Sequence, residues 1–328
     1  MIEFPSISVI ILNWNGRVIT EKCLDSLIGI TNYPKNRLNI ILIDNNSNDG
    51  SVQFFNHEYK NIIDLISLEN NIGFIKGNNY GIKVAINKYN SDYVLLLNND
   101  TEIIEENWLK TLVETATNDE VGIVGPKLIF PNDRIQWSAR KIGDNTFFLI
   151  LQTLTARMNP GFGEPKNQPY TNFSGEANTI SGACMLIKSK VIKKIGMLDL
   201  TLYPMYQEDV EFSFRVWENG YKVIYRGDVC LIHHESLTIN KTSLKTEKFY
   251  WALRNSIIVN RRYRGLWNTM IIGTPLFLFY TLFDKKNDNI KLGISNLKFR
   301  KNPISQLLIF LKCSKYIFIK RSVKVESP

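Results

Sequence analysis

The chain has 328 residues, of which 44% are hydrophobic and 22% are charged, so it can bury a sizeable core in one large or two medium domains. Its cysteines are far apart and lack C-x-x-C spacing, which excludes a zinc or redox motif of that kind and predicts free thiols in a reducing compartment. They are Cys23, Cys184, Cys230 and Cys313. The N-terminal stretch has an early Glu3, no basic region and a short apolar run, so we expect no signal peptide.

The net charge of +9 is unevenly distributed along the chain. From Asn240 onward there are 18 Lys and Arg against 4 Asp and Glu, whereas residues 1–239 have 22 against 27. An acidic body with a basic extension indicates an anionic partner, and a membrane surface or a phosphate-bearing lipid is the favoured one. Nucleic acid is not expected, because no nucleic-acid-binding motif accompanies the charge.

Strands and helices alternate through the first part of the chain. Apolar strands are predicted at residues 7–12, 38–43, 62–68 and 93–97. A helix is predicted at about 18–28, a second begins near residue 51, and a third follows the Gly-rich segment and continues through residues 84 and 86. This alternation predicts an α/β fold with a doubly wound, mostly parallel sheet flanked by helices. Ligands bind at the carboxyl edge of such sheets. The polar residues that end three of the strands, Asn13, Asp44 and Asn98 to Asp100, should therefore line one cleft.

The segment Tyr93–Thr101, YVLLLNNDT, changes abruptly from apolar residues to oxygen ligands. A short acidic motif at a strand end can hold a divalent cation, and through it the phosphates of a nucleotide. The same residue types also form turns and helix N-caps, so that interpretation is the alternative. The Gly-rich segment 70–81 likewise has two interpretations: Gly73 lets the backbone approach a ligand, or the small residues serve close helix packing.

Beyond the first sheet strands, the pattern becomes less regular. A strand at 121–130 is predicted to be interrupted at Gly125-Pro126, and residues 142–178 are rich in Gly and Pro, which is typical of a long binding loop or lid. Trp137 would line a sugar or lipid site there, or pack locally. A further strand at 180–187 begins with small residues that leave room for a substrate.

Carboxylates and histidines mark two later elements. Glu208-Asp209 begins a predicted helix, where acidic residues either stabilise the helix dipole or shift each other's pKa, as a general base requires. A strand at 221–232 ends in His233-His234. Histidines at a strand end are metal ligands or structural residues.

Taken together, seven segments in order resemble family 2 of the glycosyltransferases, most strongly its bacterial rhamnosyltransferase-like branch, which builds surface polysaccharides. They are SVIILNWNG, IILIDNNSNDGS, NIGFIKGNNYGI, YVLLLNNDTE, ISGACML, EDVEFSFR and VCLIHHES. The resemblance implies a GT-A catalytic domain at 1–239, with a nucleotide-sugar half at about 1–130 and an acceptor half at about 131–239. A helical, membrane-associating extension follows at 240–328.

For the donor, the resemblance implies that Asp44 binds the imide of uracil or thymine. The other implied nucleotide-sugar contacts are Asn13, Asn46, Gly73, Asn79, Asn98 and Asn99. Where the family has Asp-x-Asp this chain has Asn98-Asn99-Asp100, which leaves Asp100 as the direct ligand of Mn²⁺ or Mg²⁺. His233 completes the metal and diphosphate site, with His234 as the alternative.

For the acceptor, the resemblance implies Asp209 as the catalytic base with Glu208 beside it, and Ser181, Gly182 and Trp137 as acceptor contacts. The expected reaction is an inverting transfer of a sugar, rhamnose being one candidate, from a UDP- or dTDP-linked donor to a hydroxyl of a lipid-linked or polysaccharide acceptor. The alternatives are a sugar-phosphate nucleotidyltransferase and a non-catalytic, membrane-bound assembly subunit.

The basic extension is predicted to contain an amphipathic helix, FYWALRNSIIVNRRYRG, and another amphipathic segment at 306–320. Its apolar stretch Ile271–Phe283 has only 13 residues, too few to cross a bilayer. We therefore expect a cytoplasmic protein attached peripherally to the inner face of the cell membrane. The alternative is that these helices pack on the catalytic domain or on a second subunit in a homo-oligomer.

Overall fold

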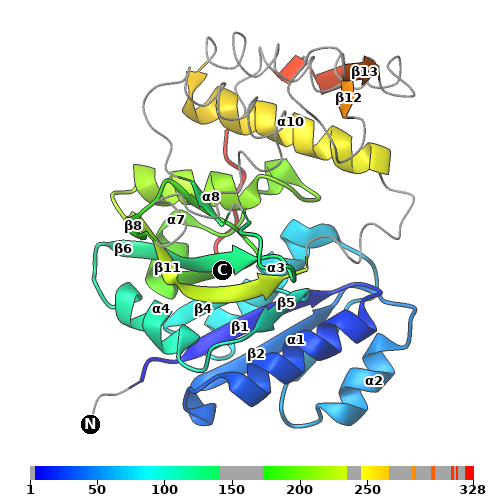
Figure 1. Cartoon of the computed structure of the whole chain (residues 1–328), viewed down its shortest axis with the longest axis vertical. Coiled ribbons are helices and arrows are strands. Elements are labelled where there is room, and N and C mark those ends of the chain that lie inside the picture. The colour runs from blue at the N-terminus through cyan, green and yellow to red at the C-terminus, as the bar shows by residue number, and fades with distance from the viewer. Residues whose placement is uncertain are drawn as a thin grey trace. The chain divides into compact units, whose positions relative to one another are not determined.

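The computed structural model describes residues 4–136, 138–140, 173–234, 245–265, 283–285, 297–299, 312–313, 315–316 and 322–328 (Figure 1). The chain divides into two compact units. One comprises Met1–Lys141, Lys166–Thr242 and Lys324–Pro328, and the other Ile142–Pro165 and Ser243–Val323. The last five residues belong to the first unit, in which Lys324 and Glu326 form hydrogen bonds to the segment Met197–Leu200.

Four parallel strands form the first part of the central sheet. They are β1 (Ile7–Asn13), β2 (Leu38–Asp44), β3 (Asp64–Ser67) and β4 (Tyr93–Asn98). The register of β1 with its two neighbours puts Asn13 beside Asp44 and Leu12 beside Asn98. The polar ends of these strands therefore meet at one edge of the sheet, as their alternation with helices predicted.

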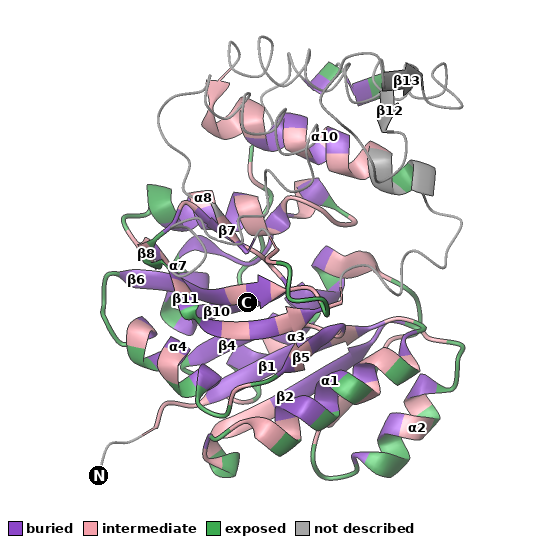
Figure 2. Ribbon diagram, in the orientation of Figure 1, coloured by how far each residue is buried: buried purple, intermediate pink, exposed green. Residues whose placement is uncertain are grey.

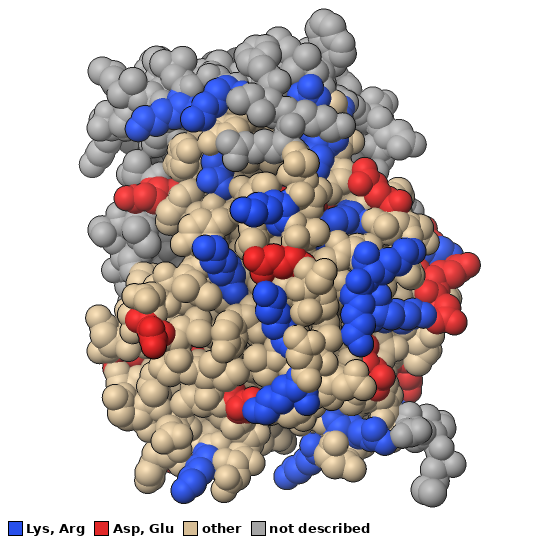
Figure 3. Space-filling model, turned by 180° about the vertical axis from the view of Figure 1, so that it is seen from behind, with Lys and Arg blue, Asp and Glu red and all other residues tan. Residues whose placement is uncertain are grey.

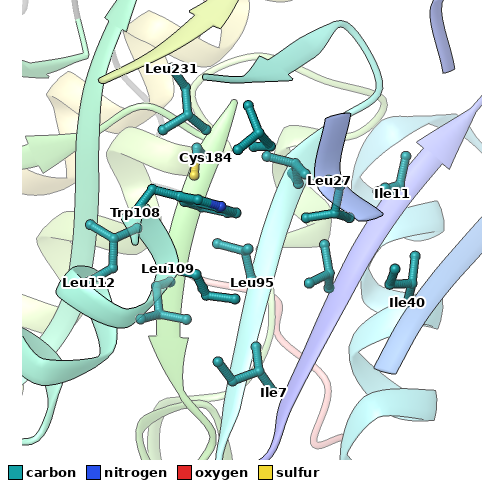
Figure 4. Close-up of a cluster of buried hydrophobic side chains, with 14 of the residues drawn as sticks. Ile7, Ile11, Leu27, Ile40, Leu95, Trp108, Leu109, Leu112, Cys184 and Leu231 are labelled. Carbon is teal, nitrogen blue, oxygen red and sulfur yellow. The ribbon is translucent and has the colours of Figure 1, made fainter. Parts of the chain in front are cut away.

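Helices cover both faces of these strands, which explains why the strands lack polar alternation. The helices are α1 (Arg17–Ile30), α2 (Ser51–Glu58), α3 (Gly73–Asn87) and α4 (Trp108–Ala116). Ile7 and Ile11 of β1 lie in one hydrophobic cluster with Leu27 of α1 and Trp108 of α4 (Figure 4). On the opposite face α3 packs so closely on β1 that a Cβ at Gly81 would lie 2.5 Å from Ile10 Cγ2.

The second part of the sheet is mixed. Its strands are β5 (Thr101–Ile103), β6 (Val121–Ile129), β8 (Ser174–Glu176), β10 (Cys184–Lys188) and β11 (Lys222–His233). The strand order is β3-β2-β1-β4-β10-β6-β11-β5, with β8 beside β11. β10 runs antiparallel to both of its neighbours, whereas β6 and β11 are parallel. Figure 2 shows the central strands as largely buried.

Two predicted strands differ from those observed. β6 continues through Gly125 and Pro126, because β10 pairs only with the earlier residues Ile123 and Val124 and the proline therefore costs no hydrogen bond on that side. The predicted strand at 180–187 is two strands, β9 (Thr179–Ile180) and β10, separated by a turn. That turn carries the small residues Ser181 and Gly182.

Short elements complete the first unit. They are η1 (Lys35–Arg37), β7 (Ala139–Arg140), α7 (Ser189–Ile195), η2 (Leu200–Leu202) and α8 (Glu208–Glu218). All four cysteines are free, as predicted.

The described part of the second unit contains α10 (Lys245–Tyr263), β12 (Phe283–Lys285) and β13 (Leu297–Phe299). The apolar side chains Leu253, Ile257 and Ile258 of α10 are almost fully buried, so this helix does not present them to a lipid surface. None of the described helices combines the length and apolarity needed to span a bilayer. Most of the predicted apolar segments at 271–283 and 306–320 lies outside the described residues.

Candidate active site

The ends of β1 and β2 are joined by a buried hydrogen-bond network. Asn13 Nδ2 donates to Asp44 Oδ2 at 2.7 Å and to Ser47 Oγ at 3.1 Å. The amide oxygen of Asn13 accepts from Thr20 Oγ1 at 2.8 Å, and the Ser47 N–H donates to Asp44 Oδ1 at 2.8 Å. Asn13 and Asp44 are both 0% exposed. The amide of Asn13 is therefore fully hydrogen-bonded within the protein, and one of its bonds holds the Asp44 carboxylate.

The end of β2 is also tied to the start of α3. Asn45 Oδ1 accepts from the Ile72 N–H at 2.8 Å, and Asn45 Nδ2 donates to Asn71 Oδ1 at 3.0 Å. The neighbouring Asn46 is exposed and has a φ of +62°. This polar loop and helix start lie at the same sheet edge as the Asn13–Asp44 pair.

Gly73 and Asn79 of α3, both predicted to contact the donor, are in contact with other residues of the protein. Gly73 has a φ of +77°, and a Cβ there would lie 2.9 Å from Tyr203 Cε2 and 3.0 Å from Pro204 Cβ. Of the two interpretations of this glycine, the structure supports close packing. Asn79 Nδ2 donates to the Leu198 carbonyl at 2.9 Å, and its Oδ1 accepts from the Leu198 N–H at 3.0 Å. Asn79 therefore clamps the backbone of Leu198 instead of facing the cleft.

Asp100 and His233 meet because β5 pairs with β11. Their antiparallel register puts Thr101 opposite His233, and His233 Nε2 lies 3.1 Å from Asp100 Oδ1. Both side chains are at least nine-tenths buried. His234 instead lies 3.2 Å from Glu102 Oε2, so the structure brings His233 and not His234 to Asp100.

Gln136 sets the tautomer of His233. Its Nε2 donates to the His233 carbonyl oxygen at 2.5 Å, which leaves its Oε1 at 2.8 Å from His233 Nδ1. Because an amide oxygen only accepts, Nδ1 carries a proton, and Nε2 is the ring nitrogen that faces Asp100.

A ring nitrogen and a carboxylate oxygen facing each other fit a shared cation. Two ligands about 2.0 to 2.1 Å from Mg²⁺, at right angles to each other, are about 2.9 Å apart. The separation of 3.1 Å between His233 Nε2 and Asp100 Oδ1 is close to that value, and it is also the distance of a direct contact between the two groups. Within the described ranges no group of three His, Cys, Asp or Glu side chains is placed to hold a metal ion.

The two asparagines before Asp100 connect the Asp100–His233 pair to the residues that follow β1. Asn98 Nδ2 is 3.4 Å from His233 Nε2, and Asn99 Nδ2 donates to Thr20 Oγ1 at 2.8 Å. The absence of a side chain at Gly16 permits this convergence, because a Cβ there would lie 2.9 Å from Asn99 Nδ2. Thr20 thereby links Asn99 to the network that holds Asp44.

The start of α8 carries the carboxylates predicted for the acceptor side. Asp209 Oδ2 accepts from the Gly182 N–H at 3.0 Å, and its Oδ1 accepts from the Val210 N–H at 2.8 Å. The next residue of the same turn, Ala183, accepts at its carbonyl from the Asn98 N–H at 2.9 Å. One short turn therefore contacts both the metal side and the Asp209 side. Ser181 lies in this turn, whereas Trp137 lies outside the described residues.

Glu208 differs sharply from its neighbour. It is 9% exposed, and its Oε2 has no hydrogen-bond partner among the described residues. Burial, and next the charge of Asp209, raise the pKa of Glu208 to about 8. At neutral pH Glu208 is therefore mainly protonated and uncharged.

The sequence predictions did not include Gln136, Thr20 or Arg215. A histidine that binds a metal needs an acceptor for its second ring N–H, so a partner for His233 was to be expected. No local motif identifies Gln136 as that partner, because it lies 97 residues earlier in the chain.

The chain is similar to known proteins over much of its length. Over 250 residues the chain is 25% identical to the O-antigen biosynthesis protein RfbC of Myxococcus xanthus, covering 75% of this chain but only 18% of that protein. Over 236 residues it is 25% identical to the N-acetylglucosaminyl-diphospho-decaprenol L-rhamnosyltransferase of Mycobacterium tuberculosis, covering 66% of this chain and 72% of that enzyme.

Among solved structures, the chain is similar to GalNAc-T7 in complex with UDP, GalNAc and Mn²⁺. The TM-score is 0.59 at 18% identity, over 81% of this chain and 50% of that one, which indicates a shared GT-A fold. The model of glycosyl transferase family 2 matches residues 8–196, more than half of the chain. The protein therefore belongs to glycosyl transferase family 2 and is a glycosyltransferase.

Proposed function

We propose that this glycosyltransferase moves a sugar from a UDP- or dTDP-linked donor to a hydroxyl of a lipid-linked or glycan acceptor, with Mn²⁺ or Mg²⁺ and with inversion at the anomeric carbon. One observation carries the proposal. The turn Ser181–Ala183 bonds to Asn98, beside the Asp100–His233 pair, and to Asp209, so the His–Asp pair and the Asp209 carboxylate lie on either side of one short segment. The rhamnosyltransferase relative supports a lipid-diphosphate acceptor and L-rhamnose as a donor sugar.

On the donor side, Asp100 and His233 would hold the ion, and the remaining positions would be filled by water and diphosphate oxygens. The ion supplies Lewis-acid stabilisation of the diphosphate leaving group. Asp44 is held by Asn13 and Ser47 and would accept the imide N–H of uracil or thymine. The polar loop residue Asn46 and the amides Asn98 and Asn99 surround this side of the site.

On the acceptor side, Asp209 would remove the proton from the acceptor hydroxyl as that oxygen attacks the sugar. Gly182 and Val210 orient its carboxylate through their N–H groups. A single attack from the face opposite the leaving group inverts the anomeric configuration. Glu208, protonated at neutral pH, leaves Asp209 as the base of the pair.

The basic extension would hold the enzyme at the inner face of the membrane, where a lipid-linked acceptor is displayed. The support is the charge asymmetry along the chain, 18 Lys and Arg against 4 Asp and Glu from Asn240 onward. Figure 3 shows Lys and Arg side chains on one face, several of them grouped together, with Asp and Glu side chains beside them.

The test is a transfer assay with the full chain, Mn²⁺ or Mg²⁺, and a panel of UDP-, dTDP- and GDP-sugars. The acceptor is a polyprenyl-diphosphate sugar presented in anionic or in zwitterionic vesicles. We expect transfer from a UDP- or dTDP-sugar that requires the metal, is faster on anionic vesicles, and gives the inverted anomer by NMR. Transfer without metal, or with a retained anomer, would contradict the proposal.

The Gln136→Ala variant should bind Mn²⁺ about 10- to 100-fold more weakly than the wild type, because His233 loses the acceptor that fixes its tautomer. Titration of Mn²⁺ by electron paramagnetic resonance measures this directly. Gln136→Glu keeps an acceptor for Nδ1–H and is the matched control, for which a smaller loss is expected. Equal Mn²⁺ affinity in the Ala variant and the wild type would show that Gln136 does not support metal binding by His233.

Glu208→Gln should change how stability depends on pH. Folding raises the pKa of Glu208 from 4.5 to about 8, so the stability that its protonated form contributes is full below about pH 4.5 and is lost as the pH rises to about 8. In this window the wild type should lose up to about 1.4 kcal/mol per pH unit relative to the variant, whose amide cannot ionise. Urea unfolding of both proteins from pH 5 to 9 measures the difference. Parallel curves would show that Glu208 titrates normally.

A further inference from the structure

The last residues of the chain lie along a buried segment of the first unit. We call Lys324–Glu326 the C-terminal strap. The Leu200 N–H donates to the Lys324 carbonyl at 2.9 Å, and the Met197 N–H donates to the Glu326 carbonyl at 3.2 Å. The two stretches therefore run in opposite directions, like a short pair of strands. The Lys324 N–H also donates to Asp199 Oδ1 at 2.9 Å, and Asp199 is 0% exposed.

The strap fits closely over this segment. Gly196 has a φ of +83°, and a Cβ there would lie 2.7 Å from Val325 Cγ2. Glu326 forms an ion pair with Lys83 at 3.0 Å, with both side chains nearly half exposed. Figure 1 draws the C-terminal end, marked C, in the first unit, to which these residues belong.

The segment under the strap is also held by two helices. Arg215 of α8 donates to the Ile195 carbonyl at 2.7 Å and to the Met197 carbonyl at 2.8 Å. From α3, the Asn79 amide bonds to both backbone groups of Leu198. The strap, α3 and α8 thus all fix the short stretch Ile195–Leu200.

This stretch leads directly to the proposed base. After η2 the chain reaches Pro204, whose carbonyl accepts from the Ile75 N–H of α3 at 3.1 Å. Tyr206 and Gln207 then have φ values of +78° and +68°, a region that residues other than glycine occupy only where the surroundings hold them. Asp209 follows two residues later.

We propose that the C-terminal strap is a positioning element for Asp209, an inference that rests on the proposed role of Asp209 as the base. The strap holds Ile195–Leu200, and that stretch controls Asp209 by two routes. One is the chain itself, through Tyr206 and Gln207. The other is Arg215, which ties α8 back to the same carbonyls. Loss of the strap lets the start of α8 shift, and small misplacements of a catalytic group slow a reaction strongly.

The test compares variants that differ in one backbone bond. Lys324→Pro removes the N–H that Asp199 accepts, whereas Lys324→Ala keeps it and is the control. Deletion of residues 324–328 removes the strap, and deletion of 327–328 removes only the end that makes none of these bonds. Glu326→Gln breaks the exposed ion pair alone and should matter little.

We expect kcat to fall at least about tenfold in Lys324→Pro and in the 324–328 deletion, with the donor KM within about twofold of the wild type. The three control variants should keep kcat within about twofold. An unchanged kcat in Lys324→Pro overturns the proposal. So does a donor KM that rises in proportion to the loss of rate, since that indicates general damage.

Hydrogen–deuterium exchange tests the strap without any sugar transfer. In Lys324→Pro the amides of Met197 and Leu200 should exchange faster, and so should those of residues 206–211 at the start of α8. Unchanged protection at 206–211 overturns the inference even if the protein is an active transferase. If no nucleotide sugar is a donor for the wild type, the proposed function fails, and the exchange result still decides whether the strap holds α8. If the deletion variant does not fold, the Lys324→Pro and Lys324→Ala pair decides both measurements.

Discussion

Asp209→Asn is expected to lower kcat by about 10²- to 10⁴-fold while donor binding in the presence of metal stays unchanged. The amide oxygen of Asn can still accept from the Gly182 N–H that holds Asp209 Oδ2 at 3.0 Å, whereas the Val210 N–H loses its side-chain acceptor. What is lost is the capacity to take a proton from the acceptor hydroxyl. Steady-state kinetics with saturating donor, together with calorimetric titration of the nucleotide, separates these two effects.

Glu208→Gln is the matched control for this experiment. Because Glu208 is mainly protonated at neutral pH, its amide analogue keeps the charge of the site and should retain activity within a few-fold. If Asp209→Asn remains active and Glu208→Gln does not, the two roles are reversed. If both remain active, neither carboxylate is the base. If the wild type binds a donor and transfers nothing to any acceptor, the non-catalytic alternative is the better description.

Arg215→Ala should lower the free energy of unfolding by about 3 to 5 kcal/mol. Arg215 forms a two-pronged ion pair with Glu211, at 3.1 Å and 2.9 Å, and the two side chains are 6% and 0% exposed. Its removal leaves a buried carboxylate without its counter-charge. It also leaves the carbonyls of Ile195 and Met197 without their donor.

Urea unfolding at pH 7 measures this loss, and two further variants sharpen it. Lys222→Ala breaks an exposed ion pair with Glu120 and should cost less than about 1 kcal/mol. The double variant Glu211→Gln with Arg215→Met removes both charges and should recover part of the stability, because no uncompensated charge stays buried. A loss below about 1 kcal/mol for Arg215→Ala would show that water reaches the Glu211 carboxylate.

Much of the architecture follows from local patterns. Unbroken apolar runs such as residues 7–12 and 93–97 require cover on both faces, and alternation with helices makes the strands parallel. The polar residues that end them, among them Asp44 and Asp100, then share one edge of the sheet. The acidic pair at the start of α8 is equally visible in the sequence. These features depend on periodicity and on neighbours along the chain, which a sequence states directly.

Contacts between residues far apart in the sequence could not be predicted from local patterns. The sequence does not tell which of His233 and His234 lies beside Asp100. The pairing of β5 with β11 decides this, because it turns the His233 ring toward Asp100 and the His234 ring toward Glu102. Gly125-Pro126 is typical of a strand break, yet the strand continues, because β10 pairs with β6 only at Ile123 and Val124. Hydrogen-bonding capacity belongs to the residue type, whereas the partner depends on the tertiary arrangement.

Hydrogen bonds between residues far apart in the sequence also determine which side chains are available at the candidate site. The Asn79 amide carries a donor and an acceptor suited to a nucleotide, but both bond to Leu198, 119 residues away. The link between Lys324 and Asp199 spans 125 residues. The strand ends and helix starts that carry the candidate site residues could be predicted from the order of amino acids. The orientation of His233, the restraint on Asp44 and the strap beneath the path to Asp209 were set by folding, because each depends on chain segments that only the packed structure brings together.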